Sequence, residues 1–180
     1  MKHQFRIIPA VVAAAIAIAP AAHAADGTIE FQGVITDTTC AISVNAGTNN
    51  GTVMLPAIGA SALPAAGATA GTTPFTITLA GCAGATLNTA HTHFEMGPAV
   101  DVATGRLNNT SGTATGVQIE VLNAAQSPIR LGAAASQGDL AVDISSGGAT
   151  LGYYARYYAD AAAVTPGTVV SRVDYTIQYL

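Results

Sequence analysis

Two histidines and a glutamate form the most conspicuous cluster of potential metal ligands along the chain: His91, His93 and Glu95. Imidazole and carboxylate groups both bind zinc. Alternate residues of an extended strand share one face, so the three side chains would point the same way. At ~3.3 Å per residue, however, His91 and Glu95 lie roughly 13 Å apart, too far to share one ion. A zinc site would need a ligand from elsewhere in the chain. We therefore predict a solvated strand face and no metal site.

Basic residues, on which much other chemistry depends, are scarce. Beyond residue 24 the chain has no lysine, and its four arginines and ten carboxylates give a net charge of −6. Without lysine there can be no P-loop and no lysine Schiff base. The sequence also has no nucleophile-elbow or dinucleotide glycine pattern, and a zinc hydrolase using His91 and His93 would lack a visible general base. We predict that the protein is not an enzyme, needs no cofactor and does not bind nucleic acid.

The first 24 residues have the pattern of an export signal. Lys2 and Arg6 precede an apolar run that is interrupted by Pro9, and residues 22–24, Ala-His-Ala, fit a small-x-small cleavage site. The run is shorter than the ~20 apolar residues of a membrane-spanning helix. We expect residues 1–24 to be removed, Ala25 to begin the mature chain, and the protein to be exported without inserting into a membrane.

Cys40 and Cys82 are the only cysteines. An isolated even pair in an exported protein is typical of a disulfide, and we predict that these two are bonded. The bond would close a loop of 42 positions. In the chain-entropy account such a loop contributes roughly 4 kcal/mol of stability. A reactive thiol or a metal ligand is the less favoured alternative.

Hydrophobic periodicity of two residues dominates the chain, which indicates short strands. Turn signals separate the strands, and residues 57–70 are broken by Gly59, Pro64 and Gly67 into a loop. We predict one all-β sandwich. Its expected strands are 52–55, 75–79, 91–96, 117–121, 140–144, 153–159 and 168–180.

Two faces follow from the alternation of residues 153–158. Tyr153, Ala155 and Tyr157 form one face, which we expect in the core. Tyr154, Arg156 and Tyr158 form the other face, where tyrosines could stack on a sugar. An outer face that shelters Arg156 or is covered by a neighbouring subunit is the favoured interpretation.

Both ends of the mature chain alternate as well, and several further segments share a known pattern. The sequence resembles the subunits of chaperone–usher fimbriae, in particular the main shaft subunits of type 1-like fimbriae, over nearly the whole mature chain. The resemblance is carried by Phe31-Gln32-Gly33 ahead of Cys40, by residues 74–79 running into Gly81-Cys82, and by residues 114–119, 153–157, 164–167 and the final strand with its penultimate Tyr179.

The resemblance implies an incomplete immunoglobulin-like sandwich that lacks its final strand. Residues 25–36 would be an N-terminal donor-strand extension and residues 37–180 the pilin domain. The donor strand 28–35 would fill the groove of a neighbouring copy or related subunit, after a periplasmic chaperone has occupied that groove and delivered the subunit to an outer-membrane usher. The residues facing into the partner's groove would be Ile29, Phe31, Gly33 and Ile35, and the groove-edge strand would present Val173, Tyr175, Ile177 and Tyr179.

The functional expectation is therefore a structural subunit of an adhesive fimbria, exported through the periplasm to the cell surface. Its length and its arm favour a shaft subunit over a two-domain tip adhesin, while a shaft subunit and a minor adaptor both fit the sequence. The alternative is a secreted β-sandwich domain that binds carbohydrate through Tyr154 and Tyr158.

Overall fold

The computed structural model describes residues 30, 33, 35, 38–84, 87–134 and 136–180. The expected signal peptide and the donor positions Ile29 and Phe31 lie outside the described residues. The chain divides into two compact units, Met1–Val34 and Ile35–Leu180. The second unit contains every strand of the fold. Within the described residues, no helix is long and apolar enough to cross a membrane.

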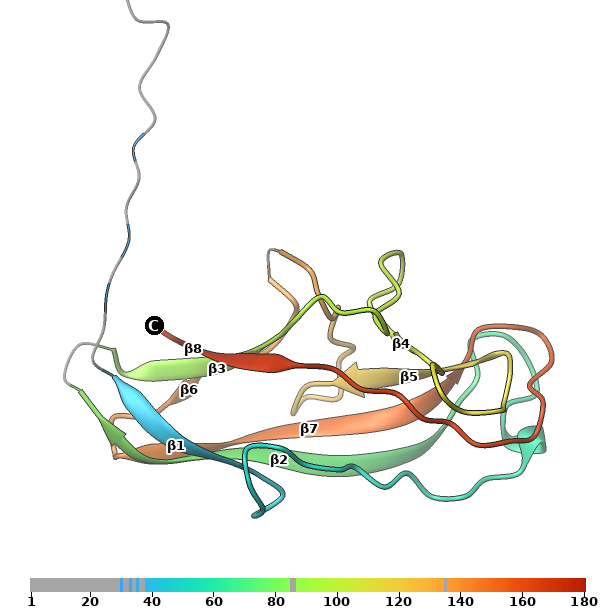
Figure 1. Cartoon of the computed structure of the whole chain (residues 1–180), viewed down its shortest axis with the longest axis horizontal. Helices are drawn as coiled ribbons and strands as arrows, with labels where there is room; N and C mark the ends of the chain where they lie inside the picture. Colours follow the sequence, from blue (N-terminus) through green and yellow to red (C-terminus); the bar gives the residue numbers. More distant parts are fainter. Residues whose placement is uncertain (1–29, 31–32, 34, 36–37, 85–86, 135) are drawn as a thin grey trace, which may run out of the picture. The chain divides into compact units, whose positions relative to one another are not determined.

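The larger sheet has five antiparallel strands in the order β1-β2-β7-β5-β4 (Figure 1). Its two longest strands, β2 and β7, pair with each other over almost their whole length and form the centre of the sheet. The strands are β1 (Thr39–Val44), β2 (Thr69–Ala83), β7 (Gly148–Ala159), β5 (Val117–Leu122) and β4 (Leu107–Asn108).

The smaller sheet has three strands in the order β6-β3-β8 and faces the larger one. Its strands are β6 (Val142–Asp143), β3 (Thr89–Phe94) and β8 (Tyr175–Tyr179), and one 3-10 turn, η1 (Ala60–Ala62), precedes β2. Among the described residues, the last strand, β8, pairs with β3 and with no other strand. The fold class predicted from the alternating pattern, an all-β sandwich, is confirmed.

The core lies between the sheets and is organised around Tyr153 of β7, which is 1% exposed. Its ring stacks on Phe75 of β2 at 5.3 Å and meets the edge of Phe94 of β3 at 5.5 Å. One aromatic side chain therefore joins both sheets, through pair geometries that are favourable for aromatic rings. The prediction that Tyr153 and Ala155 face the core is confirmed.

The opposite face of β7 carries a polar cluster centred on Glu120, which is 3% exposed. The Glu120 carboxylate accepts hydrogen bonds from Arg106 Nε at 2.9 Å and from Arg156 Nε at 2.8 Å. The Arg106 guanidinium in turn lies 3.5 Å from the centre of the Tyr158 ring. A buried carboxylate is thus neutralised by two arginines, and one face of Tyr158 is covered by a cation–π contact. This arrangement shelters Arg156 and removes a stacking surface from the sugar-binding alternative.

Several strand boundaries differ from the predicted ones. Residues 52–55 are extended but form no strand, and 140–144 contributes only Val142–Asp143. Strand β2 begins at Thr69, inside the segment expected to be a loop, and the C-terminal strand begins at Tyr175 rather than 168. In each case the deciding factor is whether a neighbouring strand is available to pair, which local alternation does not reveal.

The predicted disulfide between Cys40 and Cys82 is present and joins β1 to β2. The register of the two strands shifts beside it, since Thr39 pairs with Ala83 but Ala41 pairs with Ala80. Gly81 lies in this irregularity with φ +60°, a backbone conformation that glycine adopts readily. The disulfide therefore fastens an edge strand at the point where its hydrogen-bond ladder is interrupted.

Replacing both cysteines with serine should lower the free energy of unfolding by roughly 4 kcal/mol, because the unfolded chain regains the entropy of the closed loop. Urea unfolding followed by circular dichroism measures the change. Reductant should lower the midpoint of the wild type and leave that of the double-serine variant unchanged. Equal midpoints for the two proteins without reductant would show that the bond adds no stability.

Candidate functional site

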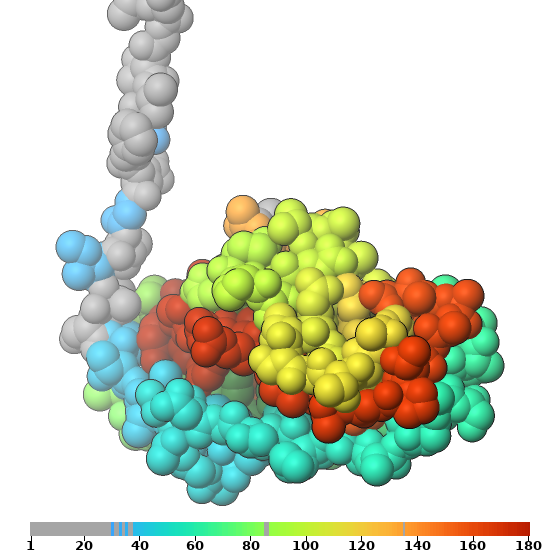
Figure 2. All heavy atoms as spheres, turned by 45° about the vertical axis from the view of Figure 1, so that its right-hand side comes forward, coloured from blue at the N-terminus to red at the C-terminus, as the bar shows by residue number. Residues whose placement is uncertain are grey.

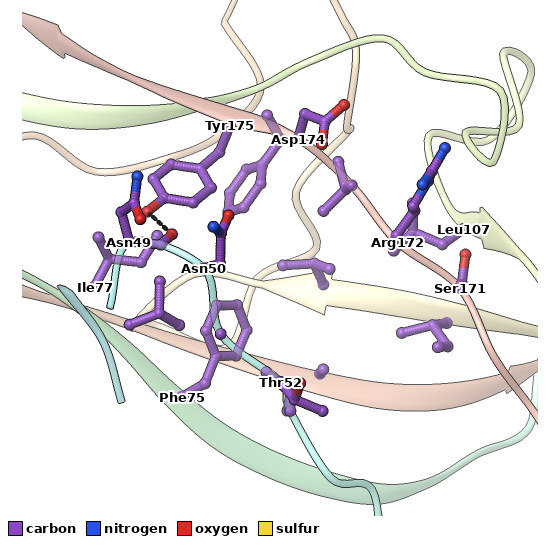
Figure 3. Close-up of a pocket in the computed structure, with 18 of the residues that line it drawn as sticks. Asn49, Asn50, Thr52, Phe75, Ile77, Leu107, Ser171, Arg172, Asp174 and Tyr175 are labelled. Carbon is purple, nitrogen blue, oxygen red and sulfur yellow. Dashed lines mark hydrogen bonds between the residues drawn. The ribbon is translucent and has the colours of Figure 1, made fainter. Parts of the chain in front are cut away.

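The most prominent concave feature of the described residues is a groove of about 810 Å³ between the two sheets. The segment after β1 lines one side, and β8 with the residues before it lines the other. In the close-up, Asn49, Asn50 and Thr52 come from the first side and Ser171, Arg172 and Asp174 from the second (Figure 3). Both segments also face the viewer in the space-filling view, in cyan and red (Figure 2).

The floor of the groove is apolar. Ile119 lies near the middle of β5, yet it stays partly exposed while its same-face neighbours Val117 and Val121 are 5% and 4% exposed. Fully burying an apolar side chain of this size is worth about 1.5–3 kcal/mol, so covering the exposed part of Ile119 would add stability. The other apolar floor residues are Phe75, Ile77, Phe94, Leu107, Val121 and Ala155.

The first rim of the groove is the free edge of β8. Thr89 and Leu180 exchange both of their backbone hydrogen bonds, at 3.0 and 2.8 Å. Because bonded and non-bonded pairs alternate in an antiparallel ladder, Thr176 and Gln178 also point their backbone groups toward β3. The backbone N–H and C=O groups of Tyr175, Ile177 and Tyr179 point the other way. Strand β8 thus presents to the groove a row of backbone groups that have no partner in the described part of the chain.

The second rim is the segment 51–58, between β1 and η1. These residues form no backbone hydrogen bond with any other described residue. Val53 and Leu55 line the groove, whereas Met54 between them is 79% exposed. An extended segment with apolar residues on its inner side and unpaired backbone groups is ready to accept a strand.

One hydrogen bond joins the first rim to the chain just ahead of the second rim. The Tyr175 hydroxyl donates to the Asn49 carbonyl oxygen at 2.8 Å (Figure 3). Burial raises the pKa of Tyr175 above its usual value, so the hydroxyl keeps its proton and remains a donor. Deeper along the same side, Ser171 Oγ is buried and has no hydrogen-bond partner among the described residues. The groove is therefore lined by both a paired hydroxyl, that of Tyr175, and an unpaired one, that of Ser171.

The predicted groove-edge residues lie in or beside the groove, and their role as a chaperone-binding edge remains a prediction. Val173, Tyr175 and Ile177 line the groove, and Tyr179 packs against the core beside it. Of the predicted donor residues, Ile29 and Phe31 lie outside the described residues; Gly33 is exposed and the Ile35 side chain is fully exposed. The donor role of these four residues remains a prediction.

Sequence reasoning missed the second rim and the floor residue Ile119. The alternation of Thr52-Val53-Met54-Leu55 was visible, but it was interpreted as a strand of the domain itself. The useful signal was Pro56, which cannot donate a ladder hydrogen bond and is confined to edges. An alternating segment that ends on proline could have indicated an unpaired rim.

The histidines lie on the outer face of β3, away from the groove floor. His91 and His93 border a second hollow of about 380 Å³, together with Gln178 and Asp139. His93 Nε2 lies 4.0 Å from Glu95 Oε2. Among the described residues, no group of three or more histidine, cysteine, aspartate or glutamate side chains is arranged to hold a metal ion.

Comparisons with known proteins agree on one family. The family model FimA, type-1 fimbrial protein A, matches residues 55–180. The chain is 45% identical over 172 residues to the major fimbrial subunit SMF-1 of Stenotrophomonas maltophilia, covering 91% of this chain and 99% of that one. It is 41% identical over 182 residues to the F17 fimbrial protein of Escherichia coli, covering 98% of each.

A solved structure supports the same fold. The rod subunit PapA of the P pilus superposes with a TM-score of 0.59 at 24% identity, covering 78% of this chain and 99% of that one. At this identity the likeness concerns the fold alone. It establishes an immunoglobulin-like sandwich of the pilin type.

The free edge of β8 predicts an alternating pattern of hydrogen exchange. The amides of Thr176, Gln178 and Leu180 should be protected by their bonds to β3, while those of Tyr175, Ile177 and Tyr179 should exchange at least roughly tenfold faster. Adding a peptide with the sequence of residues 28–35 should slow the second set selectively. Exchange of amides resolved by NMR provides the measurement. Uniform protection along β8 without peptide would contradict an open edge.

Proposed function

The chain belongs to the type-1 fimbrial protein family, and we propose that it polymerises into a surface fimbria by donor-strand exchange. Members of this family are structural subunits that assemble with related subunits, not enzymes. In the proposed mechanism, residues 28–35 of one subunit enter the groove of the preceding subunit. The entering strand pairs with β8 on one side and with segment 51–58 on the other.

The observation that carries the proposal is the coincidence of two unpaired backbone rims with an apolar floor. An inserted strand would pair the free groups of Tyr175, Ile177 and Tyr179 and would cover Ile119 at the same time. Each ladder bond contributes about 0.5–1.5 kcal/mol net. A small apolar ligand would bury the floor but leave both rims unpaired, so an extended peptide is the occupant that fits.

The chain itself contains a segment with the required pattern. Residues 28–35 alternate, with Ile29, Phe31, Gly33 and Ile35 on one side. At ~3.3 Å per residue the segment extends roughly 26 Å, and the extended rim 51–58 has the same number of residues. Burying Ile29, Phe31 and Ile35 would contribute about 1.5–3 kcal/mol each in gross transfer free energy.

Entry of the strand has one local cost. The hydrogen bond between Tyr175 and Asn49 crosses the mouth of the groove and has to break before a strand can lie between the rims. Its net worth is about 0.5–1.5 kcal/mol, which is small compared with the burial it permits. The contact therefore delays entry without preventing assembly.

An open groove also explains why the subunit would need a carrier before assembly. Unpaired strand edges beside apolar surface promote aggregation, and β8 contains neither lysine nor proline to discourage it. The expected export signal would deliver the chain to the periplasm. We propose that a periplasmic chaperone covers β8 there, and that an outer-membrane usher then exchanges the chaperone's strand for the arm of the next subunit.

The substitution Gly33→Leu tests the proposed strand. In the alternating donor strand, position 33 points into the partner's groove, where a leucine would clash with the floor. We expect Gly33→Leu to leave folding and chaperone capture intact and to reduce fibre yield severely, as measured by electron microscopy and by the amount of polymer on denaturing gels.

Gln32→Leu is the matched control, because position 32 points away from the groove and receives the same side chain. It should polymerise like the wild type. Normal fibres from Gly33→Leu would contradict the proposed placement, and equal loss in both variants would indicate a general effect on the arm rather than a clash in the groove.

A further inference from the structure

The smaller sheet has two edges, and they differ sharply. One edge is β8, whose backbone groups are free. At the other edge, β6 covers only the first part of β3, since it pairs Asp143 with Thr89 and Val142 with Ala90. In the same register, Leu140 would face Thr92 and Gly138 would face Phe94, but the chain leaves the sheet before these positions. The far half of β3 therefore lacks a strand neighbour on this side.

Two side chains occupy the positions of the missing strand, and one backbone group assists them: Gly132 N donates a hydrogen bond to Phe94 O at 3.1 Å. The Gln137 side-chain amide accepts a hydrogen bond from Phe94 N at 2.9 Å through Oε1 and donates one to Phe94 O at 2.7 Å through Nε2. These are the two bonds that a strand residue exchanges with its partner in a bonded antiparallel pair. Gln137 is 6% exposed, so its amide lies in a position where unpaired groups would be costly.

Asp139 makes the corresponding contact with Thr92, two residues before Phe94 on β3. Its Oδ2 accepts a hydrogen bond from Thr92 N at 2.9 Å. The same oxygen accepts a hydrogen bond from the Tyr153 hydroxyl at 2.8 Å, and that hydroxyl also lies 2.9 Å from Thr92 Oγ1. Because Tyr153 belongs to the larger sheet, Asp139 is anchored from both sheets and is held at the edge of β3.

We propose that Gln137 and Asp139 act as a side-chain cap that closes this edge of β3 to strand addition, so that a second copy of this chain can add a strand to the smaller sheet only at β8. A short edge strand is a common protection against edge-to-edge pairing. Here β6 is short, and the two side chains extend the protection over the part of β3 that it does not reach. The cap determines the direction of assembly without contacting the donor strand.

The bonds of the cap can be tested without reference to polymerisation. In the full-length mature chain, Gln137→Ala should speed exchange of the Phe94 amide and Asp139→Ala that of the Thr92 amide, each by roughly tenfold. The amides of Thr176 and Gln178, on the opposite side of β3, report whether the sheet remains folded and should stay protected. Ser136→Ala is the control, because Ser136 lies in the same segment and its Oγ accepts a hydrogen bond from Gly138 N, with no bond to β3 among the described residues.

The consequence for assembly rests on the proposed function and is measured in a separate experiment. In a Gly33→Leu background, strand exchange through the donor arm should be blocked, and light scattering should show little self-association. Adding Gln137→Ala and Asp139→Ala should then raise the association rate severalfold, whereas adding Ser136→Ala should not. If the double substitution unfolds the chain, Gln137→Glu replaces it, because glutamate keeps an acceptor for Phe94 N and loses the donor to Phe94 O.

The outcomes separate the two proposals. Normal fibres from Gly33→Leu alone would overturn the placement of Gly33 in the partner's groove and leave the amide-exchange data on the cap intact. Unchanged exchange of the Thr92 and Phe94 amides in the alanine variants would overturn the cap itself. Faster exchange without added self-association would overturn its role in directing assembly.

Discussion

Pairing of backbone hydrogen-bonding groups beside an apolar core is the constraint on which the rest of this structure depends. A strand that lies over apolar side chains cannot leave its N–H and C=O groups without partners at low cost. Most strands of this sandwich meet the requirement through their neighbours. Strand β8 meets it on one side only, and the segment 51–58 does not meet it within the described part of the chain. The free edge of β8 and the segment 51–58 lie on opposite sides of the apolar groove floor.

Contacts in the surrounding structure hold the two rims of the groove in position. The disulfide holds β1 against β2 at an interruption of their ladder, which keeps the segment after β1 near the groove. On the other side, Asn109 accepts a hydrogen bond from Val170 N at 2.8 Å and donates one to Thr168 O at 3.0 Å, so the approach to β8 is tied to the loop after β4. Tyr153 and Asp139 connect the sheets across the core. The rims are thus positioned by contacts that need no occupant in the groove.

Local sequence patterns predicted the parts of the fold that depend on local chemistry. Alternation identified the all-β class and placed Tyr153 in the core, and the isolated cysteine pair predicted the disulfide. The resemblance to fimbrial subunits predicts a groove-edge role for the C-terminal stripe, and three of its four residues line the groove. Features that depend on partners distant in sequence were missed: 52–55 alternates but is unpaired, and Gln137 and Asp139 reach β3 across more than forty residues. A polar residue in a loop gives no local sign that it will replace a strand.

The most direct test of the account is a structure of the assembled fibre at side-chain resolution, obtained by electron cryomicroscopy. The account predicts that residues 28–35 of one subunit lie between β8 and segment 51–58 of the preceding subunit, with Phe31 and Ile35 against the floor and the bond between Tyr175 and Asn49 broken. A fibre in which the groove is empty or is filled by the subunit's own arm, with subunits joined through other surfaces, would contradict it.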